Sequence, residues 1–252
     1  MKAKRLILAL ASTTVLVACS GKGAEITQEE ATEKATAISK KANASDFSSP
    51  NKYQVTSSMS MSTGSETLST SVTIDFAPDD YYLAMTGTVN SESMKAYVYW
   101  KENVLYVVTN DTYFSVEASA EDAKKAFTEY AGETADAGSS MDIEELASAG
   151  ATALEGLLNT IKMVEKAYSV ISTDKVTLDF HYYSKGDGNL TIEANIAGTD
   201  IYDMTTSITI DNYLLTDYST KMAGMESKLS VKWGNANITY PDVTKLSQVA
   251  AE

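Results

Sequence analysis

The sequence predicts an α+β fold: a large curved antiparallel β-sheet of about 10–11 strands, forming a half-barrel, with a long helix packed against its concave face. Two observations predict it. Apolar residues recur at every second position through residues 52–118 and again through 174–240, which is typical of strands with one wet and one dry face. Between these blocks, residues 142–166 carry apolar residues at the 3.6-residue period of an amphipathic helix.

The first eighteen residues have the features of a bacterial export signal. Lys2, Lys4 and Arg5 form a positive start, and an apolar stretch follows over residues 6–16. The stretch is shorter than the roughly 20 apolar residues that cross a bilayer. We therefore interpret residues 1–18 as a cleaved signal peptide.

The signal ends in Leu16-Val17-Ala18-Cys19, which resembles the lipobox of bacterial lipoproteins. This resemblance implies that Cys19 is lipidated and becomes the new N-terminus. Two or three acyl chains on one cysteine anchor durably, since each buried CH₂ contributes about 0.8 kcal/mol. We expect an anchor on the extracytoplasmic face of the cell membrane. The alternative is an ordinary signal peptide with a chance cysteine.

Composition excludes several function classes. Removing residues 1–18 takes away three basic residues and no acidic one, so the net charge falls from −14 to −17. Arg5 is the sole arginine, and nucleic-acid binding needs clustered positive charge, so we exclude nucleic acid as a partner. With one cysteine and one histidine, the chain has no material for a disulfide or a multi-histidine zinc site.

Residues 19–51 are predicted to be a lipidated N-terminus, a spacer and one short helix. Thr27 and Glu30 have the spacing of a capping box, in which each side chain accepts from the other's free backbone N–H. Ala31 and Ala35 then begin a thin apolar stripe. Residues 44–51, which are rich in serine and contain Pro50, indicate a linker.

Residues 52–245 are predicted to be the half-barrel domain. Its first block is a meander of six antiparallel strands joined by short turns. The alternating segments cover residues 53–61, 68–76, 81–89, 95–100, 104–109 and 112–117.

A helical insertion is predicted over residues 119–168. Ser119 with Asp122 marks the start of a first helix. Residues 142–166 form the long amphipathic helix. A second meander follows, with a hairpin signal at residues 186–189 and alternating segments at 176–182, 190–196, 204–210, 213–222 and 228–240. Pro241 is expected to end the last strand, and residues 246–252 are predicted to be a polar C-terminal tail.

This order of signal, lipobox, strands, helical insertion and further strands resembles the LolA/LppX/LprG-type lipoproteins. The resemblance covers about residues 25–245 in architecture, without a short motif to carry over. It implies a half-barrel that binds acyl chains of lipids or lipoproteins on an outer membrane face. The many Ser and Thr residues on the polar face, and the missing arginines, depart from some members.

Periodicity selects the residues expected to line an apolar cavity between sheet and helix, which would bind a lipid or another hydrophobic ligand. The methionines suit such a lining because they are flexible. The alternative is that the same residues are filled core. The predicted lining is Met59, Met61, Val72, Ile74, Leu83, Met85, Val98, Trp100, Leu154, Leu157, Ile161, Leu178, Phe180, Ile192 and Leu214.

Catalytic signatures are missing from the sequence. His181 alternates onto the expected wet face, where it is interpreted as a surface residue, and adjacent acidic pairs suit turns and helix starts. We predict no catalytic residues, no metal site and no cofactor. The main hypothesis is an anchored lipid binder. The second is a fully packed cell-surface lipoprotein that binds protein or cell wall, and a hydrolase using acidic residues ranks last.

Overall fold

The computed structural model describes residues 21–249, apart from 45, 49, 64–65, 78–79, 90–91, 127–142, 172–175, 199–202 and 235–237. The predicted signal peptide and Cys19 lie outside the described residues. The chain divides into two compact units. The first unit comprises Met1–Phe47 and Ser148–Leu215, and the second comprises Ser48–Ala147 and Thr216–Glu252.

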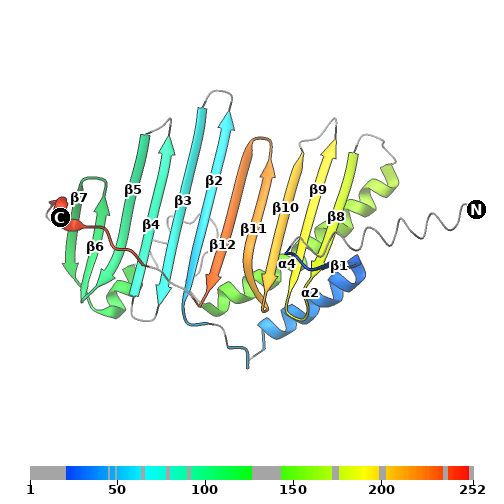
Figure 1. Ribbon diagram of the computed structural model, residues 1–252, viewed down its shortest axis with the longest axis horizontal. Helices are drawn as coiled ribbons and strands as arrows, with labels where there is room; N and C mark the ends of the chain where they lie inside the picture. The colour runs from blue at the N-terminus through cyan, green and yellow to red at the C-terminus, as the bar shows by residue number, and fades with distance from the viewer. Residues whose placement is uncertain are drawn as a thin grey trace, which may run out of the picture. The chain divides into compact units, whose positions relative to one another are not determined.

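The second unit is built around antiparallel strands in the order β11-β12-β2-β3-β4-β5-β6-β7, with β13 added parallel to β7 (Figure 1). Six of them form the predicted meander, and β12 pairs with β2. The strands are β2 (Tyr53–Thr63), β3 (Glu66–Ala77), β4 (Asp80–Val89), β5 (Glu92–Lys101), β6 (Val104–Thr109), β7 (Thr112–Glu117), β11 (Leu214–Met222), β12 (Met225–Trp233) and β13 (Ser247–Gln248).

The first unit contains an antiparallel sheet in the order β1-β8-β9-β10, two helices, and the first residues of β11. Its elements are β1 (Ala24–Glu25), α2 (Gln28–Ala42), α4 (Ile143–Ile171, from residue 148 onward), β8 (Val176–Ser184), β9 (Leu190–Gly198) and β10 (Met204–Asp211). The α+β class and the open, mainly antiparallel strand order are thereby confirmed. Strands β2 to β12 are the longer ones, and β1 and β13 are two-residue additions.

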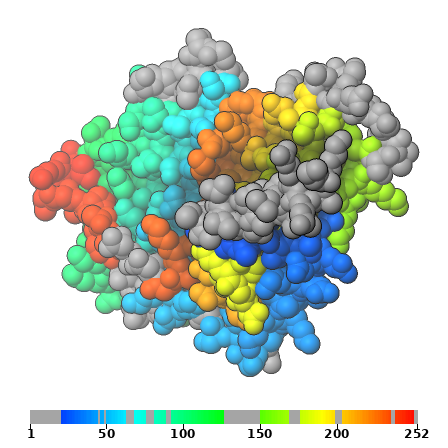
Figure 2. Space-filling model, turned by 45° about the vertical axis from the view of Figure 1, so that its right-hand side comes forward, coloured from blue at the N-terminus to red at the C-terminus, as the bar shows by residue number. Residues whose placement is uncertain are grey.

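Helix α2 begins at the predicted capping box. Thr27 accepts from the Glu30 N–H at 3.2 Å, and Glu30 accepts from the Thr27 N–H at 2.8 Å. This pairing satisfies two of the backbone donors that a helix start leaves free. Ala31, Ala35 and Ile38 are buried, and the helix contacts β8 and β9. Figure 2 shows α2, in blue, beside the yellow hairpin of these two strands.

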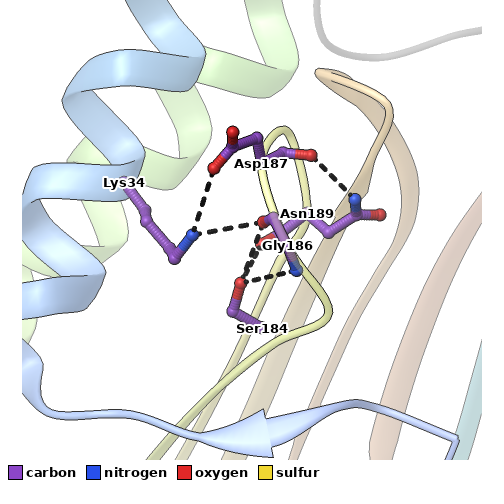
Figure 3. A network of polar contacts seen from close by, with 5 residues as sticks. All are labelled: Lys34, Ser184, Gly186, Asp187 and Asn189. Carbon is purple, nitrogen blue, oxygen red and sulfur yellow. Dashed lines mark hydrogen bonds and ion pairs between the residues drawn. The ribbon is translucent and has the colours of Figure 1, made fainter.

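A lysine of α2 also binds the turn between β8 and β9 (Figure 3). Lys34 Nζ donates to the Gly186 carbonyl at 3.2 Å and lies 4.0 Å from an Asp187 carboxylate oxygen. Inside the turn, the Ser184 hydroxyl donates to the carbonyls of Gly186 and Asn189 at 3.0 and 2.9 Å. The residues that were predicted to form a hairpin therefore make a compact turn, and Lys34 of α2 binds this turn.

Helix α4 is the predicted long helix, and it continues to Ile171 rather than ending near residue 166. Of the predicted apolar stripe, Leu154, Leu158 and Ile161 are buried and Leu157 is half-buried, and Ala151, which the stripe did not include, is buried as well. At Gly150 the helix backbone lies so close to β11 that an added Cβ would meet the Leu215 side chain at 2.6 Å. The expected packing of a long helix on the sheet is confirmed within the first unit.

The last strand differs from its prediction. Strand β12 ends at Trp233, whereas alternation had extended it to residue 240. Gly234 has a φ of 74°, a left-handed conformation that breaks the strand, and its N–H donates to the Lys52 carbonyl at 2.8 Å. The described residues after the break have no strand until β13.

Candidate ligand-binding surface

One face of the second unit's sheet carries most of its aliphatic side chains, and we call it the apolar face. Register places Ile74, Leu83 and Val98 directly opposite one another on β3, β4 and β5. Such residues share a face, so their side chains pack. They form a buried cluster with Tyr81, surrounded by half-buried Val55, Val72, Met85, Trp100, Leu105 and Val107.

The apolar face becomes exposed toward one end of the strands. Two cross-strand rows farther along the same face, Met59, Thr70, Gly87 and Met94 lie opposite one another. Met59 is 42% exposed and Met94 is 57% exposed, whereas Leu83 is fully buried. The apolar surface therefore continues beyond the buried cluster and reaches solvent.

Three further methionines complete this exposed end. Met61 lies opposite Met225, and Met225 lies opposite Met222 across the β11–β12 hairpin. Met222 and Met225 are each 44% exposed, and Met61 is half-buried. We call Met59, Met61, Met94, Met222 and Met225 the methionine patch. Exposed apolar patches of this kind mark binding surfaces, and methionine adapts to varied ligands.

The predicted lining residues occur in both units. Those on β2 to β5 belong to the apolar face of the second unit, where Ile74, Leu83 and Val98 are buried. The others belong to the first unit. There the buried ones are Leu154, Ile161, Ile192 and Leu214, and the half-buried ones are Leu157, Leu178 and Phe180. That these residues surround one ligand stays a prediction.

A hollow of about 330 Å³ lies on the second unit's sheet, and its lining is mainly polar. Met59 is the predicted lining residue that borders it. The register puts most of its serine and threonine side chains on the face opposite the apolar one, while Met59, Thr70 and Gly87 belong to the apolar face. Its lining comprises Ser58, Met59, Ser60, Ser69, Thr70, Ser71, Thr86, Gly87, Thr88, Ser93, Glu226 and Lys228.

An ion pair stands at the border of this hollow. Lys228 Nζ lies 2.7 Å from Glu226 Oε1. The hydrogen bond from Lys228, together with the lysine charge, lowers the pKa of Glu226. Alternation in the sequence predicted that these serine and threonine side chains face solvent. It did not predict that they line a hollow.

A cluster of tyrosines occupies another zone of the same opposite face, and sequence reasoning missed it. Tyr82, Tyr99 and Val108 are buried there, and the segment from Ile238 to Leu246 packs over them. Tyr99 stacks on Tyr106 with ring centres 4.8 Å apart and meets Tyr240 at 4.9 Å. Burial raises the pKa of both Tyr82 and Tyr99 to about 12.

Strand β1 pairs with β8 through its backbone, and His181 of β8 adds side-chain contacts to this pairing. The imidazole Nδ1 lies 2.8 Å from Glu25 of β1, and Nε2 lies 3.1 Å from Asp179. The hydrogen bond with Glu25 contributes most to raising the pKa of His181, and Asp179 adds to it. Lys22 binds Glu193 at 2.6 Å and lies 5.5 Å from the centre of the Tyr183 ring. His181 therefore lies between two carboxylates at the surface, and these contacts are ion pairs when the imidazole is protonated.

Within the described residues, no group of three or more His, Cys, Asp and Glu side chains is placed to hold a metal ion. No helix in the described part of the chain has the length and apolar character that a membrane span requires.

Comparison with known proteins gives structural matches alone. The sequence matches no family profile and no curated protein. LprF from Mycobacterium bovis is 12% identical, with 85% of this chain and 97% of LprF covered at a TM-score of 0.34. A LolA superfamily protein from Nitrosomonas europaea is 9% identical, with coverages of 88% and 98% and a TM-score of 0.19. A DUF1329 family protein from Desulfovibrio piger is 8% identical, with coverages of 81% and 90% and a TM-score of 0.21.

Proposed function

We propose that this chain is an extracytoplasmic lipoprotein, held on the membrane through Cys19, that binds a lipid or another hydrophobic ligand. The anchor is supported by the basic start, the short apolar stretch and the lipobox-like Leu16-Val17-Ala18-Cys19. The binding role is supported by the apolar face of the second unit.

The observation that carries the proposal is the exposed end of the apolar face. Buried Leu83 and Val98 continue along the same face into Met59 and Met94, which are about half exposed. Apolar side chains of one sheet face are ordinarily covered by the chain itself. An acyl chain laid along the row of Met59, Thr70 and Gly87 would remove this apolar surface from water, at roughly 25 cal/mol per Å².

A second candidate function rests on the polar hollow. Its wall of serine and threonine hydroxyls presents many hydrogen-bond donors and acceptors to solvent. Such a surface suits a polar partner, such as a protein or the cell wall, rather than a lipid chain. Neighbouring residues of β4 face the two surfaces, which makes the two functions separable by mutation.

Gly87 and Thr86 provide a matched pair of variants. A Cβ added at Gly87 would meet its neighbours at 3.7 Å or more, so a side chain fits there, beside Met94 and Thr70. Gly87→Glu therefore puts a charge on the apolar face. Thr86→Glu puts the same charge on the opposite face, beside the polar hollow. Each variant adds one negative charge, so general electrostatic repulsion of an anionic probe is the same in both. A difference in binding between them therefore reports on the face that carries the charge.

Binding of a fluorescent fatty acid is measured on protein that carries Cys19→Ala. Because this protein lacks acyl chains, it needs no detergent, which would compete with the probe. We expect Gly87→Glu to weaken binding at least about 10-fold, or 1.4 kcal/mol, because a carboxylate must be desolvated against the acyl chain. Thr86→Glu should bind as the parent does. Mass spectrometry of organic extracts should detect co-purified lipid in the parent. A parent protein with neither lipid nor probe binding contradicts the proposal.

The anchor is tested separately by cell fractionation. Cys19→Ala should move the protein from the membrane fraction to the medium or periplasm. Unchanged membrane retention of this variant contradicts lipidation of Cys19. This outcome does not bear on the ligand-binding proposal, which the fatty-acid assay tests.

A further inference from the structure

Four methionines of the patch lie on adjacent strands around one hairpin. They occur in two short sequence motifs, Met59-Ser60-Met61 on β2 and Met222-Ala223-Gly224-Met225 across the β11–β12 hairpin. Register brings the two motifs side by side, with Met61 opposite Met225 and Met225 opposite Met222. Residues opposite one another share a face, and so do residues two apart on one strand. All four thioethers therefore project from the same side of the sheet.

The spacing of these positions suits convergence on one point. Opposite residues of antiparallel strands have Cβ atoms about 4.5–5.5 Å apart, and diagonal neighbours lie about 7–8 Å apart. Met61 and Met225 form an opposite pair, with Met222 on one side and Met59 in the diagonal position. A methionine side chain has three rotatable bonds, so its sulfur can swing toward a shared centre.

The hairpin that supplies two of the methionines is held in place. Ala223 and Gly224 take the two left-handed positions of the turn, with φ values of 49° and 80°. The Ser62 N–H of β2 donates to the Gly224 carbonyl at 3.0 Å. An added Cβ at Gly224 would lie 2.9 Å from the Ser62 carbonyl oxygen, so the turn packs directly on β2. This contact fixes Met225 beside Met61 without help from a ligand.

Thioethers are soft, neutral donors that select monovalent copper over the harder divalent ions. We propose that Met61, Met222 and Met225, with Met59 as the adjacent donor, bind one Cu(I) ion. The exposure of Met59, Met222 and Met225 leaves their sulfurs accessible. The acidic chain, with a net charge of −14, attracts cations to its surface. The site does not depend on the lipid-binding proposal, because it uses sulfur atoms and not apolar area.

The absence of ionisable ligands gives the site a distinctive property. Histidine, cysteine and carboxylate ligands must lose a proton to bind metal, which makes their affinity depend on pH. A thioether has no proton to lose. Cu(I) affinity at this site is therefore expected to stay constant between about pH 5 and 8, the interval in which a histidine site titrates.

The experiment uses the chain with Cys19→Ala, which removes its sole thiol. Cu(I) is kept reduced with ascorbate under nitrogen and titrated in competition with the chromogenic chelator bicinchoninate. We expect one Cu(I) per chain and an X-ray absorption spectrum that contains sulfur neighbours alone. The same titration at several pH values should give one affinity.

The decisive variant is Met61→Leu combined with Met225→Leu. Met-to-Leu exchange conserves volume and apolar surface, so the fold should persist. Because even indirect supporting residues cost 10–100-fold in metal affinity, losing two direct ligands should weaken Cu(I) binding by more than about 100-fold. Met94→Leu is the matched control, since Met94 is the most exposed of the patch and lies apart from the four.

The proposal is overturned by a parent protein that binds no stoichiometric Cu(I), by a double variant that retains Cu(I), or by nitrogen or oxygen neighbours in the spectrum. A loss in Met94→Leu equal to that of the double variant would also contradict the assignment to these four residues. Gly87→Glu, which tests the lipid proposal, leaves every methionine in place and should still bind Cu(I).

Discussion

The two faces of the second unit's sheet are made from alternate residues of the same strands, and they are covered in different ways. On the apolar face, the cluster of Ile74, Leu83 and Val98 gives way to an exposed methionine patch. On the opposite face, the chain covers its own tyrosine cluster with the segment from Ile238 to Leu246 and leaves a hydroxyl-lined hollow beside it.

The difference teaches that a side chain belongs to the core when other parts of the chain pack over it. Its own hydrophobicity matters less. Tyr99 carries a polar hydroxyl yet is 2% exposed, because other tyrosines and the C-terminal segment pack on it. Met94 is apolar yet 57% exposed, because no described residue covers it to the same degree. Three predictions sharpen this contrast.

The largest effect is expected from truncating one buried side chain on each face. Leu83→Ala on the apolar face and Tyr99→Ala on the opposite face should each lower the free energy of unfolding by about 2–5 kcal/mol, because both leave cavities. Val116→Ala, at an exposed position on β7, should change it by less than about 0.5 kcal/mol. Urea denaturation followed by circular dichroism measures all three. A Tyr99→Ala cost as small as that of Val116→Ala would show that the tyrosine cluster is surface.

An intermediate effect is expected at high pH, where the tyrosine cluster should titrate late. Burial raises the pKa of Tyr82 and Tyr99 from 10.0 to about 12. The unfolded chain therefore loses these protons first, so stability is full below pH 10 and falls as the pH rises through about 12.

Tyrosinate absorbance after a rapid pH jump measures this titration before the protein unfolds. Tyr99→Phe should remove one late-titrating group, while Tyr218→Phe, at a tyrosine outside the cluster, should leave both. If every tyrosine of the folded protein ionised together near its ordinary pKa, the buried cluster would be contradicted.

The smallest effect is expected in the first unit, at His181. Alternation along β8 places His181 and Tyr182 on opposite faces of that strand. Ionic contacts with Glu25 and Asp179 hold the pKa of His181 above its ordinary 6.5. A raised pKa in the folded state stabilises the fold at low pH, and this contribution is lost as the pH rises through the raised value. Attachment of β1 to β8 should weaken accordingly.

Hydrogen exchange of the Ile26 amide, which donates to the Tyr182 carbonyl at 2.9 Å, reports on this attachment. After correction for the intrinsic rate, its protection should decline above neutral pH, and His181→Gln should remove the pH dependence. The Tyr213 amide, bound to the Gly188 carbonyl at 2.9 Å, serves as the control within the same unit. Equal pH dependence at both amides would contradict a role for His181.

Local patterns in the sequence determined most elements, because each pattern acts within a few residues. The Thr27–Glu30 capping box, the stripe of α4 and the alternation along β2 to β11 appear where they were predicted. Alternation also placed Ile74, Leu83 and Val98 on one face. It failed after Trp233, because the left-handed conformation of Gly234 interrupts a pattern that otherwise continues.

The pairing of strands that are distant in the sequence, and the covering of each face, were decided by the tertiary structure. Alternation assigns a residue to a face but does not say which strand lies beside it, so it could not place β12 against β2 or Met225 opposite Met61. Nor could it show that Ile238 and Tyr240 pack on Tyr82 and Tyr99. These contacts join residues far apart in the chain, and their free energy depends on the surface that each brings to the other.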